Sequence, residues 1–184
     1  MADPAPTVVH DQQTVYEARP WLTVTVNDIT TPDGVRRSHH SIHLGEVALV
    51  TALDDQNRVL MIRRHRWIVG QVGLETPGGI IEPGEAPEAC GRRELLEETG
   101  FKPTEPLELV ATLEPMPGLI QTKHHVFLTH NPRRVAEPSD LEEAGLLEWV
   151  PVTDTPGLLA RGQLLGAGTG LGLLLALRTI QQSP

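Results

Sequence analysis

GIIEPGEAPEACGRRELLEETGF, residues 79–101, is the most informative segment of this chain. It begins in a loop rich in glycine and proline and continues into a predicted helix over residues 86–99. Pro87 suits the first turn of a helix because it has no N–H group to leave unbonded, and Gly100 suits the position just past the helix end. The segment therefore predicts a loop and a helix in direct succession.

Three glutamates of the predicted helix share one face. Glu94 and Glu98 are four residues apart and Glu97 is three from Glu94, so all three fall within an arc of about 100°. Like charges at this spacing repel by roughly a few tenths of a kcal/mol per pair, so the cluster needs a compensating cation or full solvation. A hard divalent ion such as Mg²⁺ prefers several oxygen ligands, while an ordinary solvated helix face is the alternative.

The spacing of the fixed residues favours the metal interpretation. The segment resembles the Nudix box. That pattern is Gly-x5-Glu-x7-Arg-Glu-U-x-Glu-Glu-x-Gly-U, in which x is any residue, the first U is aliphatic and the last U is aliphatic or aromatic. Every fixed position of that pattern is filled, by Gly79, Glu85, Arg93, Glu94, Leu95, Glu97, Glu98, Gly100 and Phe101. Such a match is far more specific than a lone glycine-rich motif.

The resemblance implies a site for Mg²⁺ or Mn²⁺ on this helix. Glu94 and Glu98 would bind the metal, and Glu97 would bind it or support the cluster, which makes Glu97 a candidate catalytic residue. Glycines at 78 and 79 let the backbone approach the metal, so that the Gly78 carbonyl would be a further ligand.

Two further roles are implied next to the metal cluster. Glu85 and Arg93 resemble the structural pair that ties the loop to the helix and supports the ligands from behind. The general base of this family often comes from an acid-rich loop after the box. Glu142 and Glu143 are the candidates in this chain, and a merely solvent-exposed role stays open for each.

The flanking sequence indicates the substrate class. VRRSHHSIHLGEVALVTALDDQNRVLMIRRHRW and LETPGG, which precede the box, are similar to ADP-ribose pyrophosphatases and nucleoside diphosphate sugar hydrolases. The resemblance implies Mg-dependent hydrolysis of the pyrophosphate bond of a nucleoside diphosphate derivative, with ADP-ribose favoured and AMP and ribose 5-phosphate as products. Those relatives usually carry a glutamate after a Pro-Gly turn, whereas residues 119–122 contain no acid, so another nucleoside diphosphate sugar stays open.

Two other functions stay open at this point. One is the cleavage of free nucleoside triphosphates, against which the N-terminal extension argues. The other is a non-catalytic module that senses nucleotide sugars. Such modules tend to have lost carboxylates of the box, and this chain keeps all of them.

Arg66 and Trp21 are the candidate substrate-binding residues. Arg66 ends an apolar run and would offer paired N–H groups to phosphate oxygens, with pairing to surface acids as the alternative. ADP-ribose pyrophosphatases commonly dimerise, so the resemblance implies a homodimer whose N-terminal strands complete the partner's nucleotide site. Trp21 would then stack on the base, with burial in its own subunit's core as the alternative.

Periodicity predicts strands on both sides of the helix and a loose arm over residues 1–20. Residues 21–29 alternate as a half-buried strand does, and a second strand follows over 41–44. Further elements are strands over 46–53, 59–62, 107–113, 124–129 and 146–150, and a helix over 158–181. The expected fold is α/β, a Nudix-type α/β/α sandwich with a mixed sheet. An N-terminal arm and antiparallel strand pair over 1–44 would precede the hydrolase domain over 45–184.

Composition narrows the class of partner. A net charge of −9 over 184 residues disfavours a nucleic-acid polymer or an anionic membrane, but allows a small nucleotide bound through a divalent cation. The first residues lack a basic start and an apolar run, so we expect no secretory signal and a cytoplasmic protein. The most apolar stretch, residues 164–177, is too short to cross a bilayer.

Overall fold

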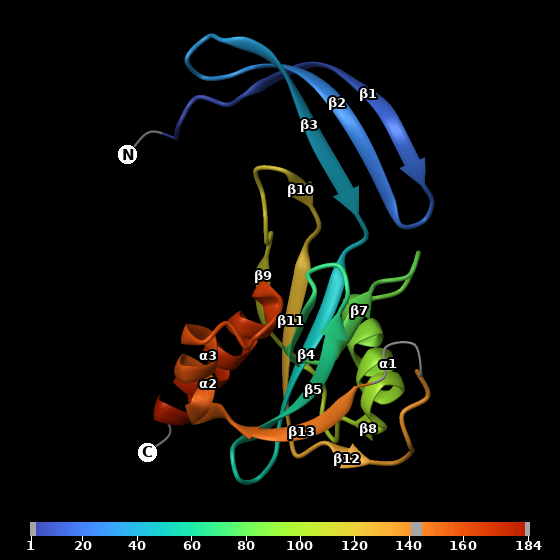
Figure 1. Cartoon of the computed structure of the whole chain (residues 1–184), viewed down its shortest axis with the longest axis vertical. Coiled ribbons are helices and arrows are strands. Elements are labelled where there is room, and N and C mark those ends of the chain that lie inside the picture. The colour runs from blue at the N-terminus through green and yellow to red at the C-terminus, as the bar shows by residue number, and fades with distance from the viewer. Residues whose placement is uncertain (1–2, 141–144, 183–184) are drawn as a thin grey trace. The chain divides into compact units, whose positions relative to one another are not determined.

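The computed structural model describes residues 3–140 and 145–182 (Figure 1). The chain divides into two compact units. The first contains the chain up to Gly45 together with Glu114–Lys123, and the second contains Glu46–Leu113 and the chain from His124 onward. The box and its helix lie in the second unit.

The first unit is built on a four-stranded sheet. Its strands, in spatial order, are β1 (Val8–Ala18), β2 (Leu22–Thr30), β3 (Arg36–Leu44) and β10 (Ile120–Gln121). The β1–β2 and β2–β3 pairs are antiparallel, and β10 joins β3 in parallel. The expected antiparallel strand extension is therefore present.

The prediction of a loose arm is wrong for most of residues 1–20, because β1 pairs along the whole length of β2. Nearly every residue of β1 is exposed, so neither of its faces required the apolar alternation that marks a half-buried strand. Main-chain hydrogen bonds to β2 hold this strand in place. The predicted strand over 41–44 is also longer than expected, since β3 begins at Arg36.

The second unit contains a mixed sheet in the order β13-β5-β4-β11-β9, with β6 paired to β5 and β7 paired to β4. Only the β4–β11 pair within this described sheet is parallel. The bounds of these strands are β4 (Val47–Leu53), β5 (Arg58–Arg66), β6 (Gln71–Glu75), β7 (Gly78–Ile80), β9 (Glu108–Leu113), β11 (His124–His130) and β13 (Leu146–Pro151). A small separate pair is formed by β8 (Phe101–Lys102) and β12 (Arg133–Arg134).

Helices cover both faces of this sheet, as the sandwich prediction requires. The helices are α1 (Pro87–Thr99), α2 (Thr155–Ala160) and α3 (Ala167–Gln182), with a short 3-10 turn η1 (Val152–Asp154) before α2. In Figure 1, α1 lies on one side of the sheet and α2 with α3 on the other.

Two apolar cores hold these layers together, because alternate residues of each central strand face opposite sides. The core on the α1 side contains Ala48, Val50, Ala52, Leu60, Cys90, Leu95, Leu107 and Phe127. The core on the α3 side contains Leu53, Val59, Met61, Leu74, Leu128, Val152, Leu158, Leu173 and Ala176. Strand β5 illustrates the alternation, since Leu60 faces α1 while Val59 and Met61 face α3.

The predicted helix over 158–181 is interrupted, which corrects the sequence-based expectation. Gly162 and Gly166 adopt left-handed backbone angles (φ 64° and 81°) between α2 and α3. The linker pairs with β6 instead, through a hydrogen bond from the Leu74 N–H to the Gln163 carbonyl at 2.9 Å. Within α3, a side chain at Gly172 would clash with Thr51, so glycine lets the helix approach the sheet closely. Among the described residues, no helix is long and apolar enough to span a membrane.

Candidate active site

Strand β7 brings the glycines of the box against the sheet, although this stretch was expected to be loop. Gly78 pairs with Leu49 of β4, and a side chain at Gly78 would collide with the Ala48 carbonyl. A side chain at Gly79 would collide with the carboxylate of Glu94. Glycine at 78 thus lets β7 lie against β4, and glycine at 79 leaves room for the Glu94 side chain beside the loop.

Helix α1 has the ends that the sequence predicted. Pro87 occupies its first turn, and Gly100 adopts a left-handed conformation (φ 76°) while its N–H bonds the Leu96 carbonyl at 2.8 Å. Leu95 and Cys90 pack into the core between α1 and the sheet.

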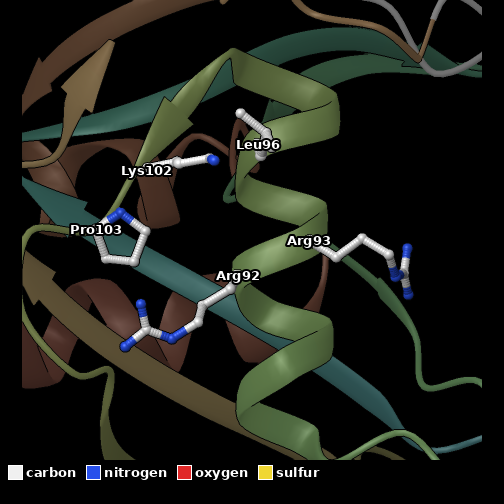
Figure 2. Close-up of a pocket in the computed structure, with 5 residues that line it drawn as sticks. All are labelled: Arg92, Arg93, Leu96, Lys102 and Pro103. Carbon is white, nitrogen blue, oxygen red and sulfur yellow. The ribbon is translucent and has the colours of Figure 1, made fainter. Parts of the chain in front are cut away.

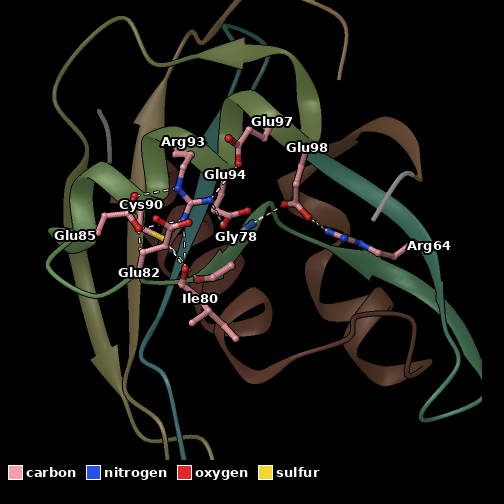
Figure 3. Close-up of polar contacts among 11 residues, drawn as sticks. Arg64, Gly78, Ile80, Glu82, Glu85, Cys90, Arg93, Glu94, Glu97 and Glu98 are labelled. Atoms are coloured by element: carbon pink, nitrogen blue, oxygen red, sulfur yellow. Dashed lines mark hydrogen bonds and ion pairs between the residues drawn. The ribbon is translucent and has the colours of Figure 1, made fainter. Parts of the chain in front are cut away.

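The three box glutamates differ in their exposure. The side chain of Glu98 is 2% exposed, that of Glu94 13% and that of Glu97 42%. They thus form a graded face from the buried side of α1 to solvent, and Figure 3 shows this face with its polar contacts.

Glu98 is held at both of its oxygens. The Gly78 N–H donates to Oε2 at 2.8 Å, and Nη2 of Arg64 donates to Oε1 at 2.7 Å. Burial raises the pKa of Glu98 to about 7, because the charged carboxylate loses its hydration, while Arg64 and the Gly78 N–H oppose that rise. An additional cation near Glu98 would favour its charged form.

Arg93 links the loop to the other two glutamates. Its Nε and Nη2 donate to the two Glu85 oxygens at 3.0 and 3.1 Å, so the predicted loop–helix pair is present. Its Nη1 also donates to Glu94 at 2.6 Å and to Glu97 at 3.1 Å. The guanidinium holds the pKa of Glu85 below its usual value, and Glu85 in turn raises the pKa of Arg93.

A buried ion network on the strand side was missed by sequence reasoning. Nε of Arg64 lies 3.3 Å from Oε2 of Glu75, and Nη2 of Arg66 donates to the same oxygen at 2.7 Å. Arg64 thus lies between Glu75 and Glu98. The two arginines alternate along β5 and therefore share a face, which was the available signal. Glu75 was not identified, because its place beside them depends on the register of β6 against β5.

Two roles were considered for Arg66, phosphate binding and pairing with an acid. In the structure Arg66 pairs with an acid. Its guanidinium binds both oxygens of Glu75. Trp21 is 62% exposed in the first unit. The alternative prediction, that Trp21 is buried in the core of its own subunit, is therefore wrong. Glu142 and Glu143 lie outside the described residues.

The residues of α1 and β7 have the right chemistry for a divalent metal ion, because carboxylate oxygens and a glycine backbone meet there. One oxygen of each of Glu94, Glu97 and Glu98 already accepts a hydrogen bond from a guanidinium group, however. No cluster of three His, Cys, Asp or Glu residues in the described part of the chain is arranged to hold a metal ion as it stands. A divalent ion would therefore compete with Arg93 for Glu94 and Glu97, both of which are partly exposed.

Two nearby features add no reactive group to this face. A shallow cavity of about 350 Å³ is lined by Arg92, Arg93, Leu96, Lys102 and Pro103. Figure 2 shows Arg93 pointing away from the other lining side chains, so the cavity lies on a different side of α1 from the carboxylates. Burial, with a contribution from Glu85, raises the pKa of the Cys90 thiol to about 12. Cys90 is therefore not a nucleophile at neutral pH.

Comparisons with known proteins identify the family. Residues 43–165 match the family model of the NUDIX domain. A CMP-5'-(N-acetyl-N-hydroxy-3-aminopropyl)phosphonate hydrolase of Streptomyces rubellomurinus is 34% identical over 90% of this chain and 80% of its own length. An ADP-ribose pyrophosphatase of Bacillus subtilis is 32% identical over 72% of this chain and 71% of its own.

A solved structure supports the fold. The crystal structure of an ADP compounds hydrolase superposes with a TM-score of 0.81, covering 98% of this chain and 97% of that one at 21% identity. Together with the filled box on α1, these matches establish the family. The chain belongs to the Nudix family and is a Nudix pyrophosphohydrolase of nucleotide derivatives.

Proposed function

We propose that this enzyme cleaves the anhydride between a nucleoside 5′-monophosphate and a second phosphorus-bearing group, with ADP-ribose as the favoured substrate. The products from ADP-ribose would be AMP and ribose 5-phosphate. The observation that carries the proposal is the graded carboxylate face of α1, with Glu98 fixed against the backbone of β7. Hard oxygen ligands of this kind suit Mg²⁺ or Mn²⁺, which bind substrate phosphates while keeping part of their water shell.

Hydrolysis adds a water oxygen to one phosphorus and breaks the bond from that phosphorus to the bridging oxygen. The bridging oxygen leaves with the other group. A bound divalent ion would neutralise charge on the phosphates and lower the pKa of a coordinated water. Glu94, Glu97, Glu98 and the Gly78 carbonyl are the proposed ligands. Arg93, which is tied to the loop through Glu85, would hold the partly exposed glutamates until the metal ion takes over its contacts with them.

Residues beyond the metal ligands complete the proposed chemistry. Arg66 would neutralise phosphate charge, and a phosphate would compete with Glu75 for its guanidinium. Glu142 and Glu143 remain the candidates for the general base that accepts the proton of the water.

A CMP-linked phosphonate is a second substrate candidate, and two observations favour it. The Streptomyces relative named for such a compound matches more of this chain than the ADP-ribose pyrophosphatase does. Residues 119–122 also lack the acid that usually follows the Pro-Gly turn in enzymes that cleave ADP-ribose.

A substrate panel tests the proposed function. Purified enzyme with Mg²⁺ or Mn²⁺ would be given ADP-ribose, a CMP-linked phosphonate, other nucleoside diphosphate sugars and nucleoside triphosphates, and the products would be separated by chromatography. We expect a nucleoside monophosphate from a diphosphate-linked substrate and a much lower kcat/KM for triphosphates. Faster cleavage of triphosphates would overturn the substrate class. Tight nucleotide binding without turnover at any metal concentration would identify a sensor instead.

We also propose a homodimer in which the strands of the first unit complete the partner's nucleotide site, with Trp21 stacking on the base. The exposed indole of Trp21 supports this role, because stacking needs an accessible aromatic face. Light scattering should show a dimer at micromolar concentration. Trp21→Ala should raise KM more than it lowers kcat, while Trp67→Ala, which removes another exposed indole, serves as the control. A fully active monomer, or an unchanged KM in Trp21→Ala, would remove the shared site.

A further inference from the structure

Two adjacent arginines of β5 have opposite environments. Arg63 points to the surface, where its Nη2 donates to Glu148 at 2.9 Å and its side chain is 36% exposed. The side chain of Arg64 is 4% exposed and lies between the carboxylates of Glu75 and Glu98. The pleat of the strand separates the two guanidinium groups, so one belongs to the surface and the other to the site.

Burying a guanidinium between two carboxylates is not an efficient way to stabilise a fold. Desolvating the charges costs about as much as their attraction returns, and apolar residues of similar size often stabilise at least as well. A role in stability alone therefore accounts poorly for Arg64. What the planar guanidinium provides is direction, because its N–H groups have fixed positions and fix the oxygens they bind.

We propose that Arg64 is a positioning residue for the divalent metal ion, because it and the Gly78 N–H each hold one oxygen of Glu98 in a single orientation. The inference rests on the proposed function, since it requires Glu98 to be a metal ligand. A carboxylate oxygen that accepts one hydrogen bond retains a lone pair for a cation, so both contacts can persist when the metal is bound.

The anchoring of Arg64 indicates that it positions Glu98 and does not compete with the metal. Its guanidinium is also bound at Glu75, which Arg66 binds in turn, and it has almost no exposure through which to swing away. Arg93 differs in this respect, because its partners Glu94 and Glu97 lie on the more exposed side of the helix. Arg64 thus prepares one ligand, whereas Arg93 has room to give way to the ion at two.

Mn²⁺ binding in the absence of nucleotide tests this role, with free Mn²⁺ followed by electron paramagnetic resonance. Arg64→Gln should weaken Mn²⁺ binding by about tenfold or more, the usual effect of losing a group that orients a ligand. Arg63→Gln, one residue away on the opposite face, should bind Mn²⁺ like the wild type. Arg64→Lys keeps the positive charge but lacks the planar set of N–H donors of a guanidinium group. This variant should bind Mn²⁺ roughly threefold more weakly than the wild type.

The outcomes separate this inference from the proposed function. Equal or tighter Mn²⁺ binding by Arg64→Gln, with a wild-type enzyme that binds Mn²⁺ normally, would overturn the positioning role alone. A wild-type enzyme that binds no Mn²⁺ would overturn the proposed metal site itself. If Arg64→Gln does not fold, because it leaves Glu98 buried without its partner, Arg64→Lys decides, and wild-type affinity in that variant would overturn the inference.

Discussion

Different kinds of interaction stabilise the inside of each of the two units. In the first unit, polar side chains bond to one another across the sheet. Asn27 donates to Ser41 at 2.9 Å, Gln12 donates to Asn27 at 2.8 Å, and Thr25 shares a hydrogen bond with Ser41 at 2.8 Å. In the second unit, two apolar cores fix the sheet between its helices.

The two kinds of interaction contribute different amounts of free energy to folding, and this difference affects which unit can support a catalytic site. A hydrogen bond contributes about 1 kcal/mol net, whereas burying a large apolar side chain contributes about 1.5 to 3 kcal/mol. The box helix lies on the apolar unit, where Leu95 and Cys90 anchor it. We therefore expect the second unit to keep its fold when Glu94 or Glu98 is replaced, and the first unit to be sensitive to single polar substitutions.

The largest expected effect is on turnover in the second unit. Glu94→Gln and Glu98→Gln should each lower kcat by about two orders of magnitude or more, which corresponds to about 2.7 kcal/mol of transition-state stabilisation. The fold should be largely preserved, as circular dichroism would check. Glu88→Gln is the matched control, because Glu88 lies on the same helix but pairs with Arg92 at its outer side. Near-normal turnover in both ligand variants would contradict the site assignment.

The next largest effect is expected for Glu85→Gln, which weakens the link between loop and helix. Loss of the charged pair with Arg93 should lower stability by about 1 to 3 kcal/mol and activity by about tenfold. Thermal melts and steady-state kinetics would measure both. A melting temperature equal to that of the wild type, together with abolished Mn²⁺ binding, would instead make Glu85 a ligand.

A local effect on stability alone is expected in the first unit. Asn27→Ala removes donors to Ser41 and to the His39 carbonyl, and should destabilise this sheet by about 1 to 3 kcal/mol. Hydrogen exchange should accelerate in β1 to β3 and stay unchanged in β4, β5 and β11. Asp28→Ala, which removes only a solvent-exposed ion pair with Arg36 on the opposite face of β2, is the control, because such surface pairs contribute little. Uniform acceleration in both units would show that they do not differ in the way described.

The sequence predicted the site helix better than the sheet around it, for physical reasons. Pro87 and Gly100 fix the ends of α1 locally, and the spacing of the glutamates alone places them on one face. Strand β1 was missed because both of its faces are exposed. Its sequence therefore does not alternate between apolar and polar residues. One continuous helix was predicted over residues 158–181, whereas the backbone angles of Gly162 and Gly166 end one helix and precede another.

The contacts of the site were harder to predict than its residues. Glu75 meets Arg64 and Arg66 only through strand pairing, which no local pattern in the sequence specifies. The pair of Glu85 with Arg93 followed from the family pattern, but the additional bonds of Arg93 to Glu94 and Glu97 did not. Such contacts depend on side-chain packing between elements and not on periodicity within one element.

The smallest effect is expected at Cys90. Because its pKa is raised to about 12, the thiol stays protonated at pH 8 and buried in the core. Iodoacetamide should modify the folded enzyme far more slowly than the unfolded chain, and Cys90→Ser should change kcat by less than about twofold. Rapid alkylation with parallel loss of activity would show that the core beneath α1 opens more readily than described.

Anomalous scattering from Mn²⁺ in crystals of the enzyme tests the central claim most directly. We predict a peak bonded to oxygens of Glu94 and Glu98, with Glu97 and the Gly78 carbonyl as the remaining candidate ligands, and its loss in crystals of Glu98→Gln. The contacts from Arg64 and the Gly78 N–H to Glu98 should persist beside the ion. A catalytically active crystal with Mn²⁺ bound only away from the carboxylate face of α1 would contradict the account.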